Sequence, residues 1–134
     1  MGGLAVARCY RLRHEELRTW VTALAALRTE VSFGRTRLPA AMRRAGRAAG
    51  GACETVLTRA ADGLERGGDG RTPRECLSDA LRTMAKGGGQ ATHLWDEDID
   101  ILLALGEALG SSGPDDQVRH IMLASWCAIR SEAS

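Results

Sequence analysis

Apolar residues recur every three or four positions in six segments of the chain, and this spacing constrains the fold more than any other feature. Such a period gathers apolar side chains on one face of an α-helix, and no segment alternates as a strand does over a useful length. Glycines separate the segments, and Gly34, Gly50 and Gly110 stand where C-terminal caps are expected. The pattern predicts helices within six segments: 17–31, 38–49, 53–64, 76–84, 95–109 and 118–129.

The composition favours the same fold class. Of 134 residues, 44% are hydrophobic, yet only one is Phe and one is Tyr, whereas 21 are Ala. Helices tolerate Ala and Leu well, and strands prefer β-branched and aromatic residues. A chain of this length has room for one domain. We therefore expect an all-α protein, a single compact bundle of about six helices, with five residues in its core: Trp20, Leu24, Leu102, Leu109 and Trp126.

Acidic and basic residues are divided unevenly between the two halves. Residues 1–50 carry ten Arg and three Glu, and residues 51–134 carry eight basic and 14 acidic groups. Such halves can meet each other, a neighbouring protein or an anionic membrane. Arg43, Arg44 and Arg47 cluster on one predicted helix. They form either a solvated face or a docking face for a partner or lipid headgroups.

Residues with catalytic potential are few. No spacing of the three His residues matches a metal motif, and we expect no cofactor and no metal. Asp96, Glu97 and Asp98 precede an apolar run, where solvated carboxylates favour a helix start. Two alternatives stay open. One is a small acid–base enzyme using Asp96, Asp98 and His93, and the other is a nucleic-acid-binding module using Arg43, Arg44 and Arg47.

The four cysteines, Cys9, Cys53, Cys76 and Cys127, lie far apart and include no C-x-x-C pair. Cys53 and Cys76 fall on apolar stripes, which predicts buried thiols. No run of about 20 apolar residues is present. Residues 1–13 join a short apolar stretch to several Arg, so we interpret them as the remnant of a membrane-proximal segment and residues 14–131 as the helical domain.

Two segments resemble the stage III sporulation protein AB family. Residues 27–42, LRTEVSFGRTRLPAAM, resemble the family pattern L-x-T-E-I-x-Y-G-x-T-P-L-P-E-A-L, and residues 98–117 resemble D-x-x-I-L-x-x-L-G-x-x-L-G-x-S-D-x-x-x-Q. The resemblance extends over about residues 4–130, although Arg37, Ala40 and Gly113 depart from the pattern. The matched motif residues are Glu30, Gly34, Leu38, Pro39, Gly106, Leu109, Gly110 and Gln117.

The resemblance implies a fold and a function. The family is similar to the first cytoplasmic domain of the platform F proteins of type II secretion and type IV pilus machines. Its members belong to the channel complex between mother cell and forespore, are held in the mother-cell membrane by terminal helices, and expose this domain to the cytoplasm. The expected partner is the stage III sporulation protein AA motor ATPase. The resemblance thus implies an assembly protein that is not an enzyme and binds no nucleic acid.

The connection between Gly34 and Pro39 is expected to set the angle between the first two helices. Gly34 would cap the first helix in the left-handed conformation, and Pro39 would begin the next one with its φ already fixed. This corner would then position Arg43, Arg44 and Arg47 as a docking face. None of the three is a predicted core residue, so their reversal to Glu is expected to leave melting nearly unchanged.

Overall fold

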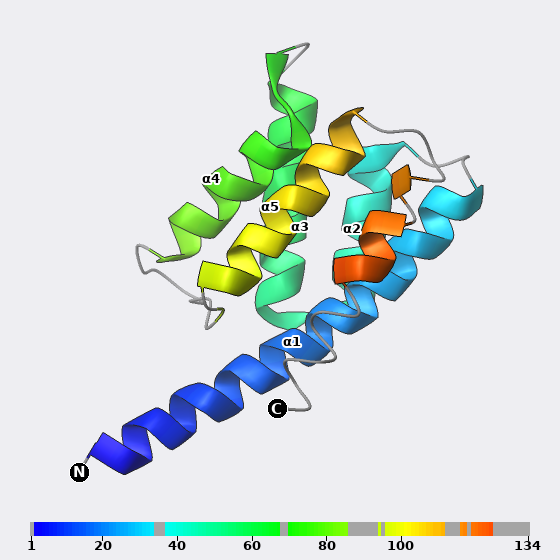
Figure 1. Cartoon of the computed structure of the whole chain (residues 1–134). Coiled ribbons are helices and arrows are strands. Elements are labelled where there is room, and N and C mark those ends of the chain that lie inside the picture. The colour runs from blue at the N-terminus through cyan, green and yellow to red at the C-terminus, as the bar shows by residue number, and fades with distance from the viewer. Residues whose placement is uncertain are drawn as a thin grey trace.

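The computed structural model describes residues 2–33, 37–67, 70–85, 94, 96–111, 116–117 and 119–124. Within these ranges the secondary structure is helical, without a strand, as the spacing of apolar residues predicts. Figure 1 shows the arrangement. The helices are α1 (Gly2–Phe33), α2 (Leu38–Ala49), α3 (Gly51–Arg66), α4 (Pro73–Ala85) and α5 (Asp96–Ser111), and residues 119–124 are also helical.

Helix α1 is longer than its apolar stripe predicts. It extends over 32 residues and continues through residue 13, where we placed the boundary of the helical domain. Its N-terminal part runs out beyond the other helices (Figure 1). No helix of the described residues combines the length and the apolar character that crossing a bilayer requires.

Two helix ends follow from local sequence signals. Thr72 accepts a hydrogen bond on Oγ1 from the backbone N–H of Glu75 at 3.2 Å, and Pro73 is the first residue of α4. Gly50 follows α2 with φ 72° and ψ −173°, a backbone conformation that essentially only glycine adopts and that costs other residues about 1–3 kcal/mol. The chain therefore turns directly from α2 into α3.

Gly110 corrects one prediction, because it is not a C-terminal cap. It lies inside α5, next to the start of α4. A Cβ atom at Gly110 would stand 2.9 Å from Cδ of Pro73, and one at Gly106 would stand 3.0 Å from the backbone Cα of Arg74. Both positions need glycine because the two helices approach too closely for a side chain.

The core is formed by the inward faces of the helices. Trp20, Leu24, Leu102 and Leu109 are 3 to 6% exposed, as predicted, whereas Trp126 lies outside the described residues. Burial of each large apolar side chain contributes about 1.5–3 kcal/mol. The bulkiest fully buried side chains are Met42, Met84, Ile121, Val56 and Cys53.

Candidate functional site

A buried ion pair joins α1 to α5. The guanidinium of Arg13 donates from Nε to Oδ2 and from Nη2 to Oδ1 of Asp98, both at 2.9 Å. The two side chains are only 5% and 7% exposed. The sequence analysis placed Asp98 among solvated carboxylates at a helix start, and the structure corrects this: Asp98 is the buried partner of Arg13.

Both charged residues continue apolar stripes, and this is the signal that sequence reasoning missed. Arg13 stands four residues before Leu17, and Asp98 stands four residues before Leu102. Positions four apart share a helix face, so each charge lies in line with buried side chains. A buried charge requires a partner of opposite sign, which each supplies to the other.

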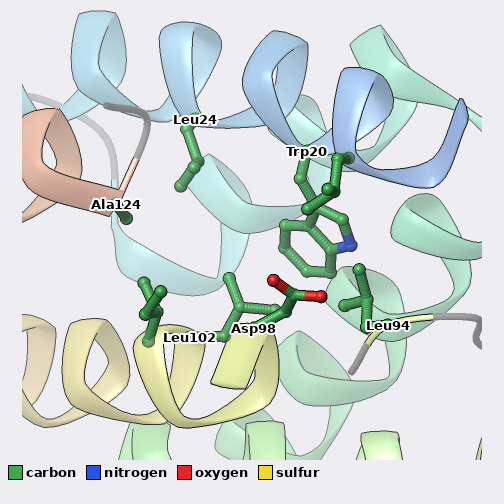
Figure 2. A pocket seen from close by; sticks show the side chains of 8 residues that line it. Trp20, Leu24, Leu94, Asp98, Leu102 and Ala124 are labelled. Atoms are coloured by element: carbon green, nitrogen blue, oxygen red, sulfur yellow. The ribbon is translucent and has the colours of Figure 1, made fainter. Parts of the chain in front are cut away.

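A small cavity lies beside this ion pair (Figure 2). It holds about 20 Å³, enough for one water molecule. The indole Nε1 of Trp20, one of the lining residues, is buried and has no hydrogen-bond partner among the described residues. The lining residues are Leu17, Trp20, Leu24, Leu94, Asp98, Ile101, Leu102 and Ala124.

The two described residues of the acid–base alternative, Asp96 and Asp98, lie in different environments. Asp96 is exposed at the start of α5, and Asp98 is held by Arg13. His93 lies outside the described residues. Among the described residues, no group of three or more His, Cys, Asp or Glu side chains is placed to hold a metal ion.

The three clustered arginines of α2 have different environments. Arg43 donates to Asp62 and Glu65 of α3, with 2.6 Å for each shortest contact. Hydrogen bonding to Glu65 and Asp62 raises the pKa of Arg43, and the same bond to Arg43 lowers the pKa of Glu65. The basic and acidic halves of the chain therefore meet at this contact. Because Arg43 bridges two helices, we now expect its reversal to Glu to lower stability, whereas the sequence alone predicted nearly unchanged melting.

Arg44 and Arg47 lie farther out on α2. Arg44 is 62% exposed and contacts Glu30 of α1 at 3.3 Å, so Glu30 of the first family motif helps to join α1 and α2. Arg47 is exposed in the last turn of α2, where a cation favours the helix dipole. The docking hypothesis therefore rests on Arg44 and Arg47 rather than on Arg43.

The remaining residues of the first motif form the start of α2. Leu38 is its first residue and packs against the core, and Pro39 lies in its first turn. Gly34 lies outside the described residues, so its capping role stays a prediction.

The second motif fixes the contact of α5 with α4 and the end of α5. Gly106 and Gly110 allow the close approach described above, and Leu109 is buried. Gln117 donates from Nε2 to the backbone oxygen of Leu109 at 3.2 Å, which satisfies a carbonyl of the last turn. An open groove lies where α5 approaches the start of α4. It is lined by Thr72, Arg74, Gly106, Glu107 and Gly110.

The two thiols that the structure describes are buried. Cys53 and Cys76 are free and, as predicted, inaccessible. Burial raises the pKa of each thiol, and the charge of Glu16 adds to the shift at Cys53. Such thiols are poor nucleophiles, because the thiolate is the reactive form. The side chains of Cys9 and Cys127 lie outside the described residues.

Comparisons with known proteins agree on one family. The family model "Stage III sporulation protein AB (spore_III_AB)" matches residues 1–126. A solved structure of a stage III sporulation protein AB (SpoIIIAB) covers 92% of this chain and 93% of its own, with a TM-score of 0.76 at 23% identity. No curated protein sequence matches the chain.

Proposed function

The chain belongs to the stage III sporulation protein AB family, and from this membership we propose that it is a non-enzymatic assembly component of the channel between mother cell and forespore. In this role it docks the stage III sporulation protein AA motor ATPase and resembles the platform F proteins of secretion machines. The domain acts at the mother-cell membrane, on its cytoplasmic side. The family match over residues 1–126 is the observation that carries the proposal.

The charge on the surface of α1 and α2 supports a docking role. Among the described side chains of these two helices and of the residue before α2, six Arg are exposed against one exposed acid, Glu15. A surface of one sign accelerates the encounter with a partner of opposite sign and selects against partners of the same sign. The exposed arginines are Arg11, Arg18, Arg28, Arg37, Arg44 and Arg47.

A binding measurement with purified proteins tests the proposal. The chain, held at low concentration, is titrated with the motor ATPase at low ionic strength. We expect a saturable complex that weakens as the ionic strength is raised and that Arg82→Glu, an exposed reversal on α4, leaves unchanged. A folded chain that fails to bind the ATPase under these conditions contradicts the docking role.

The enzyme alternative is tested separately in sporulating cells. Replacement of Asp96 and His93 by Ala removes two residues of the supposed acid–base site and spares the buried pair. An assembly protein has no turnover to lose, so we expect sporulation to continue at its normal frequency. A loss of sporulation with normal protein level would favour a chemical role for these residues.

A further inference from the structure

The exposed face of α2 carries a basic stripe, which we define as Arg37, Arg44 and Arg47. Arg44 and Arg47 lie on one face of the helix with Ala40 between Arg37 and Arg44, and Arg37 is the N-cap residue. The spacing from 37 through 40 and 44 to 47 is three, four and three residues. Residues so spaced follow one side of a helix.

The exposed face of α5 carries an acidic stripe, which we define as Glu97, Asp100 and Glu107. All three are exposed, as is Ala104 between Asp100 and Glu107. Asp98 of the same helix does not belong to this stripe, because its side chain is buried against Arg13. Helix α5 contains no basic residue, so the outer face of α5 is uniformly acidic.

The two stripes match each other when the helices run antiparallel. Read backward, the acidic stripe has the spacing 107, 104, 100 and 97, which is again three, four and three. Arg44 then stands opposite Asp100, and Arg47 stands opposite Glu97. At the outer end Arg37 faces Glu107, and Ala40 faces Ala104, where two small side chains let the helices approach closely.

This match cannot be used within one molecule. The main contacts of α2 are with α1 and α3, and α5 packs chiefly on α4. Both stripes point outward, on the exposed faces of their helices. In Figure 1, α5 passes in front of α3, and α2 lies to the right of α3.

From this charge and register complementarity we infer that the partner of the basic stripe is the acidic stripe of a second copy of this chain. Contact between two different faces is heterologous, so each copy in a pair keeps one unused stripe, which is acidic in one copy and basic in the other. The copies then extend into a ring or a filament. This inference goes beyond the proposed function and does not depend on the motor ATPase.

Two residues of the stripes already form ion pairs within the chain, and these pairs compete with the contact between copies and weaken it. Arg44 also contacts Glu30 at 3.3 Å, and Glu107 contacts Arg74 at 2.7 Å, both at exposed positions. Surface ion pairs of this kind contribute little individually. We therefore expect self-association at high protein concentration, with each pair changing the dissociation constant by about two- to fivefold.

Sedimentation of the purified chain over a range of concentrations tests the inference. We expect association at about 0.01 M ionic strength and its loss at about 1 M, where the Debye length falls from about 30 Å to about 3 Å. Arg47→Glu or Glu97→Arg should each weaken it at least fivefold, whereas Arg82→Glu should not. Circular dichroism checks that each variant is folded. If Arg47→Glu does not fold, Arg47→Gln is measured in its place.

A charge exchange tests the register. The double variant Arg47→Glu/Glu97→Arg restores an attractive pair at the predicted position, so its association should recover. The variant Arg47→Glu/Glu107→Arg has the same net charge but the wrong register, and it should not recover. A monomeric chain at low ionic strength, or equal recovery by both double variants, overturns the inference. A monomer that loses ATPase or anionic-vesicle binding through Arg47→Glu assigns the stripe to that ligand instead.

Discussion

Replacement of Asp98 by Ala is expected to lower the free energy of unfolding by about 3–5 kcal/mol. The variant leaves the Arg13 guanidinium buried at 5% side-chain exposure, without the carboxylate that accepts two of its hydrogen bonds at 2.9 Å. A domain of this size is stabilised by roughly 5–15 kcal/mol in total, so the loss is a large share.

The matched variants separate the cost of removing one partner from the net contribution of the pair. Asp96→Ala removes an exposed carboxylate two residues away, which interacts with the helix dipole, and should lower stability by at most about 1 kcal/mol. Arg13→Met/Asp98→Leu removes both charges together and should be close to the parent in stability, because the desolvation penalty disappears with the pair.

Urea unfolding, followed by far-UV circular dichroism, measures all three variants. The loss for Asp98→Ala should persist at high ionic strength, since salt screens buried pairs far less than exposed ones. The reasoning is refuted if Asp98→Ala costs no more than Asp96→Ala, or if the double variant is as unstable as Asp98→Ala.

Three further outcomes follow from packing, burial and ion pairing. Gly106→Ala should destabilise the protein by about 1–3 kcal/mol in thermal melting, because its Cβ would press on the Arg74 backbone, whereas Gly70→Ala, with open space around it, should be neutral. The raised pKa of Cys53 keeps its thiol protonated in the native state, so the free energy of unfolding should fall as pH rises above 9.0, where the unfolded chain releases this proton first. Urea unfolding at increasing pH checks this sign, and stability that rises over this range contradicts it. Arg43→Ala should lower Tm more than Arg47→Ala, since only Arg43 bridges to Asp62 and Glu65; equal shifts would count against that role.

The helices could be predicted because their signals are local. Thr72 and Pro73 are typical of a helix start and stand where α4 begins, and the apolar stripes predict the buried faces. Arg13 and Asp98 are 85 residues apart, and no local rule connects them. Their alignment with apolar stripes is a signal of burial that the sequence analysis did not use, and only the packing of α1 near α5 shows that each is the other's partner.

The arginines of α2 show a second limit of sequence reasoning. Consecutive residues stand about 100° apart around a helix, so Arg43 and Arg44 point to opposite flanks of its outer face. The flank of Arg43 meets acids of α3, and that of Arg44 meets Glu30 of α1. The angle between the two side chains around the helix follows from the sequence positions, but the neighbouring helix on each side does not. Arg47 was therefore not distinguished from Arg43.

The order of contacts has a consequence for the folding kinetics. Each helix packs on the next along the chain, α1 on α2, α2 on α3, α3 on α4 and α4 on α5. Such a contact pattern has short loops to close, and chains of this kind fold quickly. The Arg13–Asp98 pair instead joins residues 85 positions apart. The chain entropy that closing so long a loop costs is lost only when the two residues meet. We therefore expect this pair to form after the folding transition state, so that its removal accelerates unfolding and leaves the folding rate almost unchanged.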